Sequence, residues 1–443
     1  MSGIVDKYLN PSFQADKFRI EFRFPKGKVF GSNVKLCKIG FKSTDSADNI
    51  QYNQNLGALG LIKSIILQDK GVEIDSCKNC AGLTAFKNLL GKPSDLYGKS
   101  QERSNIVGLD MMSKFSDVGV VQAQRITTRV ETQFLGGGEN DGADGYVPLS
   151  YFLPSLQSLQ SLDTSLMDDL RLVIELESSA VKTLRVTDKN FSNINAVLKL
   201  QEVEDPKLKA EMSAKNGVVS WETFEHDRFS LADNTTAETS LQTQETSVRL
   251  NGLRNKYVTR ILLQKVLQTN NDDIVDGANV LVSNSGSIAN LCEKVQIRVN
   301  GADKFAENGV GGDSSLSGSK SMELVAVTQD AWGEYSLGPY GCEYGKGPGA
   351  YAADIANWDI DKLISSITAQ QRSYVGCKVE DFCQDFQVIY SRGTIAGEVN
   401  AGATHKGNSS FTNLAQIVNV YYGTMRSLIV KDGSYAVKYM MNA

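Results

Sequence analysis

Residues 61–71 read Leu-Ile-Lys-Ser-Ile-Ile-Leu-Gln-Asp-Lys-Gly, and residues 291–301 read Leu-Cys-Glu-Lys-Val-Gln-Ile-Arg-Val-Asn-Gly. Both stretches have apolar residues at their first, fifth and seventh positions and glycine at the eleventh. Apolar residues two apart before a glycine are typical of a strand that enters a tight turn. The second stretch follows the first at an offset of 230 residues (291 less 61), so each half of the chain contains this unit.

Two more segments repeat in the same order. Residues 169–174 (Asp-Leu-Arg-Leu-Val-Ile) match residues 385–390 (Asp-Phe-Gln-Val-Ile-Tyr) at an offset of 216. Residues 191–200 match residues 411–420 at an offset of 220. Because period-2 patterns also recur by chance, the alternative is two β domains without duplication. Three matches in one order favour a duplicated β unit.

Strand patterns dominate the chain. Residues 18–24 alternate apolar with charged side chains, the pattern of a half-buried strand. Asp432-Gly433 lies between two strand-like runs and predicts a tight hairpin. Helical periodicity is confined to a few segments, residues 85–90, 158–170 and 359–370, where we expect short helices.

The 443 residues, 41% of them hydrophobic and 22% charged, suit two soluble domains with sizeable cores. The polar, Ser- and Thr-rich stretch at residues 230–240 predicts the junction, giving domains 1–235 and 236–443. Long Gly-rich stretches at residues 308–319 and 338–349 predict surface loops. The sequence has no run of 18 apolar residues and no signal-peptide pattern, and we expect no membrane span.

The sequence lacks the residue sets that catalysis or metal binding requires. Seven cysteines, an odd number over a long chain, indicate mostly reduced thiols. Cys77 and Cys80 form one CxxC without the second pair that a structural zinc needs, and His226 and His405 stand apart from further ligands. Gly309-Val310-Gly311-Gly312 lacks the Lys-Ser or Lys-Thr of a P-loop. We therefore predict no catalytic, cofactor-binding or metal-binding residue, no cofactor and no enzyme.

One basic stretch stands out, since the net charge is −5. Between Lys17 and Lys42 it holds eight basic residues against one acid, Glu21. A solvated strand face is one interpretation, and contact with a genome or an acidic neighbour is the other.

Several of these segments resemble one family. Residues 146–154 (Tyr-Val-Pro-Leu-Ser-Tyr-Phe-Leu-Pro) and 168–176 (Asp-Asp-Leu-Arg-Leu-Val-Ile-Glu-Leu) resemble a block of double jelly-roll major capsid proteins. Residues 57–75 and 295–301 are similar to further segments of these proteins. The likeness is strongest to those of Polinton-like viruses and virophages, in the lineage that includes the adenovirus hexon. The second half departs from the pattern, because no Pro-Leu block precedes residues 385–390.

The resemblance implies an all-β chain of two tandem jelly-roll sandwiches with long loops and a few short helices. It implies a major capsid protein made in the host cell for the virion of an icosahedral DNA virus. Its partners would be two further copies in a pseudo-hexagonal homotrimer, neighbouring capsomers, and penton and minor capsid proteins. The N-terminus would face the shell interior, with genome contact through the basic stretch. The alternative function is a tandem β-sandwich binding protein of lectin or adhesin type, and a glycan-degrading enzyme is a third, which lacks a convincing carboxylate pair.

Overall fold

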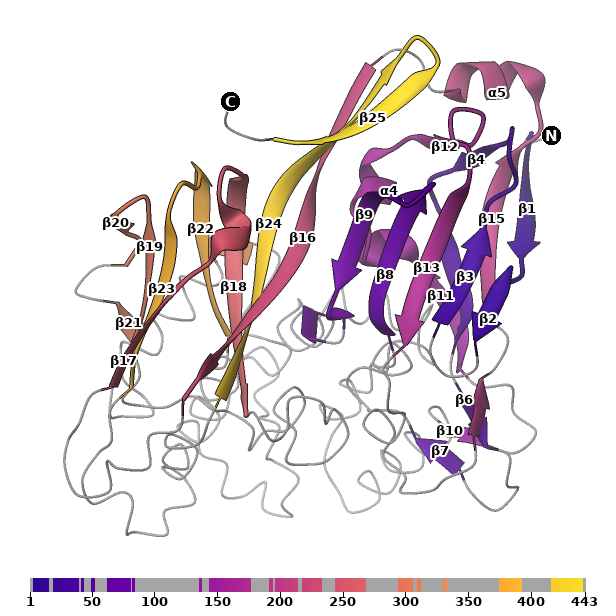
Figure 1. Ribbon diagram of the computed structural model, residues 1–443. Coiled ribbons are helices and arrows are strands. Elements are labelled where there is room, and N and C mark those ends of the chain that lie inside the picture. The colour runs from indigo at the N-terminus through magenta and orange to yellow at the C-terminus, as the bar shows by residue number, and fades with distance from the viewer. Residues whose placement is uncertain are drawn as a thin grey trace, which may run out of the picture.

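The computed structural model shows two strand bodies side by side, which we name the first roll (β1 to β15) and the second roll (β16 to β25) (Figure 1). The structure describes residues 3–15, 19–39, 41–43, 49–51, 62–80, 82–83, 135–137, 143–176, 191–193, 196–213, 217–232, 244–267, 294–305, 309–311, 330–332, 374–392 and 416–440. The predicted helices at residues 85–90 and 359–370, the loop at 338–349, most of the loop at 308–319, and His405 lie outside these ranges.

The strands of the first roll are β1 (Ile4–Leu9), β2 (Phe13–Ala15), β3 (Arg19–Arg23), β4 (Val29–Gly31), β5 (Lys35–Ile39), β6 (Phe41–Ser43), β7 (Asn49–Gln51), β8 (Ile62–Asp69), β9 (Val72–Lys78), β10 (Leu135–Gly137), β11 (Ala143–Pro148), β12 (Ser161–Asp163), β13 (Leu170–Leu176), β14 (Phe191–Asn193) and β15 (Val197–Val203). The second roll contains β16 (Gly217–Leu231), β17 (Gln244–Arg249), β18 (Tyr257–Leu267), β19 (Lys294–Val299), β20 (Ala302–Asp303), β21 (Val310–Gly311), β22 (Tyr374–Phe382), β23 (Phe386–Arg392), β24 (Gln416–Lys431) and β25 (Ser434–Tyr439). The short helices are η2 (Leu149–Tyr151), α4 (Ser155–Ser158), α5 (Pro206–Met212) and η5 (Asn251–Leu253).

Both rolls contain the same two sheets. In one sheet the order β1-β15-β5-β11 of the first roll matches β16-β24-β18-β22 of the second. In the other, β3-β13-β8-β9 matches β17-β23-β19-β20. The equivalent strands also follow one another in the same chain order, and all their pairings are antiparallel. In each roll these eight strands form two antiparallel sheets of four, and the connections cross between the sheets, which is the arrangement of a jelly roll. The predicted fold class, all-β with two tandem jelly rolls, is therefore confirmed.

The cross-strand registers reproduce the sequence repeat. Leu172 lies opposite Leu67 in the first roll, and Val388 lies opposite Ile297 in the second. These partners are related by 216 (388 less 172) and 230 (297 less 67), the two offsets found in the sequence. The segments at residues 61–71 and 291–301 therefore form equivalent strands, as predicted. The third match also falls on equivalent strands, β15 and β24, although residues 411–414 lie outside the described ranges.

Two-residue turns close the equivalent hairpins. Lys70 and Gly71 both have positive φ, of 47° and 81°, and Asn300 and Gly301 repeat this with 52° and 83°. Two successive positive φ angles match the right-handed twist of the strands they join, and glycine adopts them at little cost. A third such turn joins β24 to β25 at Asp432-Gly433, as the sequence predicts.

Strand β16 lies on the N-terminal side of the predicted boundary at residue 235. It pairs over its whole length with β24, from Gly217 opposite Val430 to Leu231 opposite Gln416. Polar residues outnumber apolar ones in this segment, so no strand was predicted there. We propose that the chain divides between β15 and β16, in the segment that carries α5.

Alternating burial builds each core. Ile20 and Phe22 of β3 are buried while Arg19 and Arg23 are exposed, which confirms the predicted alternation. In the second roll the buried side chains of β18, β19, β23 and β24 form one apolar cluster between its two sheets.

The helix predicted over residues 158–170 is wrong. Its leucines recur at helical spacing, but Leu162 belongs to β12, where it pairs with Phe30 of β4. Helix α4 ends at Ser158, and Leu170 already begins β13. The leucines at 159, 162 and 170 are all buried, but by different elements. Tertiary pairing therefore outweighs local periodicity here.

Candidate functional site at the junction of the two rolls

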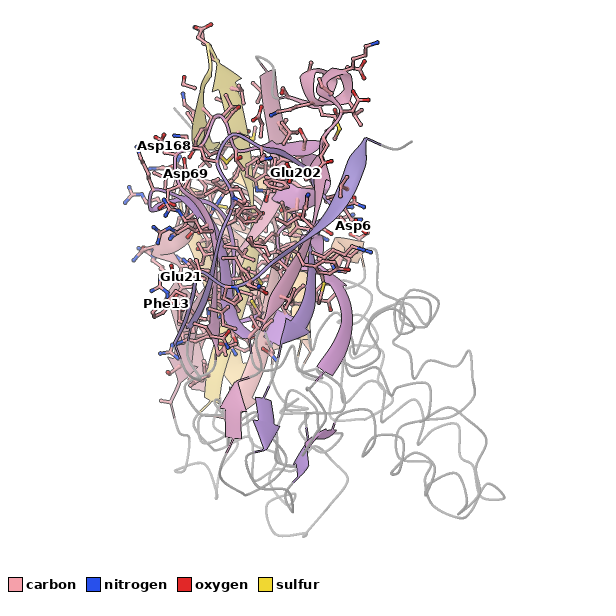
Figure 2. The ribbon with its side chains drawn as sticks, turned by 90° about the vertical axis from the view of Figure 1, so that its right-hand side faces the viewer. Asp6, Phe13, Glu21, Asp69, Asp168 and Glu202 are labelled. Atoms are coloured by element: carbon pink, nitrogen blue, oxygen red, sulfur yellow. The ribbon has the colours of Figure 1, made fainter. Side chains whose placement is uncertain are left out.

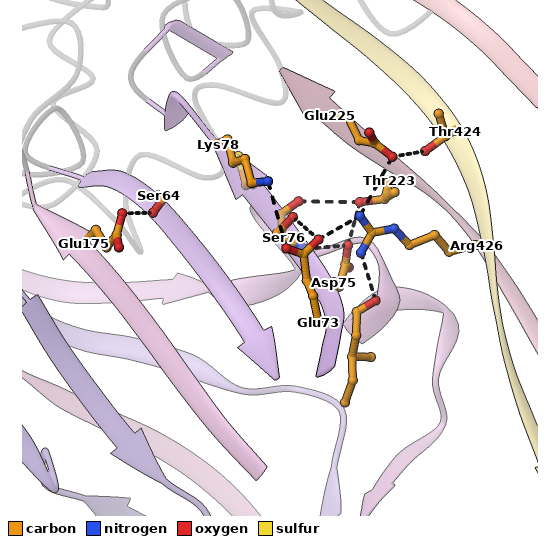
Figure 3. A network of polar contacts seen from close by, with 12 residues as sticks. Ser64, Glu73, Asp75, Ser76, Lys78, Glu175, Thr223, Glu225, Thr424 and Arg426 are labelled. Carbon is orange, nitrogen blue, oxygen red and sulfur yellow. Dashed lines mark hydrogen bonds and ion pairs between the residues drawn. The ribbon is translucent and has the colours of Figure 1, made fainter. Parts of the chain in front are cut away.

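The two rolls meet where β9, an edge strand of the first, lies beside β16, an edge strand of the second (Figure 1). An edge strand normally presents charged side chains to water. At this edge Glu73, Asp75 and Ser76 instead contact the second roll (Figure 3).

Asp75 is fully buried at the centre of the junction. Its Oδ1 accepts a hydrogen bond from the Thr223 hydroxyl of β16 at 2.6 Å and another from the Ser76 amide at 2.9 Å. Its Oδ2 accepts from the Ser155 amide, the first residue of α4, at 2.8 Å. One carboxylate thus connects β9, α4 and the second roll, and its buried oxygens are satisfied.

Arg426 of β24 provides the opposite charge. Its side chain is 2% exposed and donates to Glu73 Oε1 at 2.7 Å and to the Ile74 carbonyl at 3.3 Å. The guanidinium also lies 3.9 Å from Glu225 and 4.6 Å from the ring centre of Tyr439. Planar guanidinium suits this combination of ion pair, carbonyl contact and ring stacking better than lysine would.

The two carboxylates respond differently to this environment. Burial raises the pKa of Asp75 above its ordinary value, although the hydrogen bonds from Thr223 and Ser155 act in the opposite direction. Burial also acts to raise the pKa of Glu73, but hydrogen bonds from Ser76 and Arg426 outweigh it and the pKa is lowered. Arg426 therefore stabilises the charge on Glu73.

A second contact lies further along β16. The Tyr421 hydroxyl donates to the Asn79 carbonyl at 3.2 Å, and His226 Nε2 lies 3.2 Å from the Asn79 amide nitrogen. Gly82 fits against the Tyr421 hydroxyl so closely that an added Cβ would lie 2.0 Å from it. Burial lowers the pKa of His226, so this histidine is neutral at physiological pH.

The β24–β25 hairpin adds a third contact. The Tyr435 hydroxyl donates to Asp69 Oδ2 at 2.6 Å. Asp69 also accepts from the amides of Asp168 and Asp169 where β13 begins. The hairpin of the second roll is thereby attached to the β8–β9 turn of the first.

The structure places the cysteines of the CxxC and His226, which the sequence had offered as possible metal ligands. Among the described residues, no group of three His, Cys, Asp or Glu side chains could hold a metal. Cys77 and Cys80 are buried thiols, and Cys80 donates to the Cys77 carbonyl. His226, a residue without an assigned role in the sequence, belongs to the junction. The hydrogen bonds and ion pairs at the junction hold the two rolls together.

The basic N-terminal stretch is largely paired with acids of its own roll. Arg23 contacts Asp169 at 2.6 Å, Lys26 contacts Asp168 at 3.0 Å and Lys28 contacts Glu202 at 2.6 Å. The acids come from sequence positions more than 130 residues away, so the local count overstated the free positive charge. Figure 2 labels two of these acids, Asp168 and Glu202, in the upper part of the first roll. The side chains of Lys17, Lys38 and Lys42 lie outside the described set.

The described part of the chain contains no helix with the length and apolar character to span a membrane.

Comparisons with known proteins agree on one architecture. No family model and no curated protein sequence matches the chain. Solved structures do match. The VP54 protein of PBCV-1, fitted into a reconstruction of the virophage Sputnik, is 11% identical with a TM-score of 0.54, over 99% of this chain and 97% of that one. The mavirus major capsid protein is 10% identical with a TM-score of 0.52, over 99% and 90% of the two chains. A cryo-EM structure of the Sputnik virophage is 8% identical with a TM-score of 0.52, over 99% and 89%.

The chain has the double jelly-roll fold of viral major capsid proteins. The match extends over almost the full length of each of these chains, so both rolls and their succession along the chain are shared. At 8–11% identity the shared fold is built from very different side chains.

Proposed function

We propose that the chain is the major capsid protein of an icosahedral DNA virus and that three copies form a pseudo-hexagonal capsomer. The observation that carries the proposal is the pair of equivalent rolls held side by side by buried polar contacts. Three such chains present six similar bodies around one axis, an outline that can be surrounded by neighbours on six sides. The likeness to viral capsid proteins over the full chain supports the same conclusion.

Size-exclusion chromatography with light scattering tests the oligomer, and negative-stain imaging tests its outline. We expect a particle of three chain masses with a triangular-to-hexagonal shape. A stable monomer at micromolar concentration under all salt conditions would favour the tandem binding protein of lectin or adhesin type. The structures reported above give that alternative no support.

The same proposal places the protein in the virion, where it contacts neighbouring capsomers and penton and minor capsid proteins. A shell protein needs no catalytic site, and we propose that the chain is not an enzyme. A stoichiometric metal that purified protein loses on Cys77→Ala would contradict this.

Genome contact through the basic stretch is a separate part of the proposal. Replacing Lys26, Lys28, Lys35 and Lys38 by glutamine should reduce packaged nucleic acid in particles while leaving the trimer intact. Because Lys26 and Lys28 pair with Asp168 and Glu202, Lys26→Gln and Lys28→Gln without the other two serve as the control. Equal packaging by all variants would exclude the contact.

A further inference from the structure

Three buried polar atoms at the junction of the rolls have no hydrogen-bond partner among the described residues. They are Ser155 Oγ, Trp221 Nε1 and Arg426 Nε. Trp221 and Arg426 are each 2% exposed, and Ser155 is fully buried. A buried donor without a partner has lost its hydration and gained nothing in exchange, so native proteins rarely contain one. Each of these atoms therefore requires a partner that the described side chains do not provide.

Strand pairing places two of these side chains next to each other. Trp221 of β16 lies directly opposite Arg426 of β24. Side chains of directly opposite residues extend from the same face of a sheet, with their Cβ atoms about 5 Å apart. This face meets the first roll, because Thr223, two residues further along β16, donates to Asp75. The indole and the guanidinium are therefore neighbours in the contact between the rolls.

The third atom comes from the first roll. Asp75 accepts from the Ser155 amide through Oδ2 and from the Thr223 hydroxyl through Oδ1, so Ser155 lies at the carboxylate that β16 binds. Helix α4, which begins at Ser155, also packs against β16. Figure 3 shows Asp75 close to both Thr223 and the Arg426 guanidinium. The three atoms thus lie around Asp75 and belong to three elements of two rolls.

The chemistry of these atoms selects the ligand. Indole and guanidinium nitrogens only donate, which excludes a cation, whereas a hydroxyl both donates and accepts. An anion would be repelled by Asp75 and by Glu73 and Glu225, whose oxygens lie 2.7 and 3.9 Å from the guanidinium of Arg426. A water molecule can accept from both nitrogens and donate to Ser155 Oγ. Buried waters typically make about three such bonds to groups that otherwise have no partner.

We infer that one buried water molecule binds at the junction, accepts hydrogen bonds from Trp221 Nε1 and Arg426 Nε, and donates one to Ser155 Oγ. It connects β16 and β24 of the second roll with α4 of the first. The two rolls are then joined by two kinds of polar link, one through the Asp75 carboxylate and one through water. A bridging water contributes nearly as much as a direct hydrogen bond, so it forms part of what fixes the position of one roll against the other.

A crystal structure of the purified protein, with bromide replacing chloride in the crystals, tests the site directly. We expect an electron-density peak about 2.7–3.2 Å from both Trp221 Nε1 and Arg426 Nε, without the anomalous signal of bromide. A protein acceptor on Trp221 Nε1, or no peak within reach of both nitrogens, would overturn the inference. An anomalous peak would also overturn it, because the ligand would then be an anion.

Trp221→Phe tests the water in solution, because phenylalanine keeps most of the apolar ring and removes the N–H group. Trp332→Phe is the matched control, since Trp332 is 1% exposed and its Nε1 donates directly to the Ile261 carbonyl at 3.3 Å. Urea titrations should show that each substitution raises the equilibrium constant for unfolding by about fivefold or more. A smaller rise for Trp221→Phe, or a fall, would mean that its N–H group has no partner to lose, and the inference would be wrong.

Discussion

In the first roll Asp75 lies on the edge strand that meets a neighbouring roll, whereas Phe305 holds the equivalent position in the second. The same kind of turn precedes both residues, but Asp75 pairs with Leu67 inside β9, whereas Phe305 follows β20, which ends at Asp303. The buried carboxylate accepts a hydrogen bond from Thr223, a residue of the other roll. The difference shows that a shared fold fixes where the edges lie, and the side chains fix which edge is bound within the chain.

A shared feature strengthens this comparison. The amides at the start of β13 donate to Asp69, and the equivalent amides of Gln384 and Asp385 donate to Asn300 Oδ1. Both rolls therefore cap the same strand end with a side chain from the same hairpin. In the first roll that side chain, Asp69, also accepts from Tyr435 of the other roll. Asp69 therefore both caps the start of β13 and binds the second roll.

The largest expected effect comes from Arg426→Met. The substitution removes the 2.7 Å contact of Glu73 with Arg426 and leaves it the longer, 4.0 Å contact with Lys78, so we expect a loss of about 3 kcal/mol in the free energy of unfolding. Urea denaturation measures it. Arg298→Met is the control, because Arg298 pairs with Asp303 on the exposed β19–β20 hairpin. Equal losses for the two variants would show that the junction is no more important than a surface pair.

Asp75→Asn should cost about 2 kcal/mol, since an amide cannot accept from Ser76, Thr223 and Ser155 together. The cost should depend on pH. The raised pKa of Asp75 means that the folded chain holds more protons than the unfolded chain above the ordinary value of 3.8. This group's contribution is present at low pH and declines as pH rises through the folded pKa. Urea titrations from about pH 4 to about pH 8 should show the wild-type advantage shrinking, and a growing advantage would contradict the assignment.

Gly82→Ala should destabilise the chain by about 2 kcal/mol, because the new methyl group overlaps the Tyr421 hydroxyl. The cost should fall in a Tyr421→Phe background, which removes the oxygen. Gly31→Ala is the matched control, since its nearest neighbour would be 3.6 Å away. Thermal melts of Gly82→Ala, Tyr421→Phe and the double variant form a double-mutant cycle, and Gly31→Ala is measured beside them. If Gly82→Ala costs as much in the Tyr421→Phe background as in the wild type, the strain lies elsewhere.

The smallest effects test the equivalence of the two rolls. Gly71→Ala and Gly301→Ala each place a side chain at a φ above 80° with no atom near enough to clash. The backbone penalty should be about 1 kcal/mol and the same in both. Unfolding midpoints that differ clearly between the two variants would show that the turns are not equivalent.

The strands could be predicted where local pattern and turn chemistry agreed. The Gly71 and Gly301 hairpins and the alternating residues 19–23 gave clear signals, and their registers follow from the repeat. Strand β16 gave none, because residues such as His226, Asp227 and Arg228 interrupt its apolar positions. Its strand conformation comes from pairing with β24.

The junction could not be predicted from the sequence. Glu73 and Arg426 are 353 residues apart, and each alone resembles an ordinary charged residue of a strand. The acids that neutralise the basic N-terminal stretch were missed for the same reason. A contact between distant residues has no local pattern, and residues 72–75 (Val-Glu-Ile-Asp) alternate apolar with acidic side chains, so nothing in the sequence indicated that the Asp75 carboxylate is buried.

The separation of the junction residues affects the order of events during synthesis. Tyr435 is made 366 residues after Asp69, its partner. At roughly 5–20 residues per second, the ribosome takes on the order of tens of seconds between them. Arg426, which contacts Glu73 of β9, is likewise made 353 residues after its partner. We therefore expect the β9 edge to stay uncovered until the second roll folds, and its polar residues to protect it from pairing with other nascent chains meanwhile.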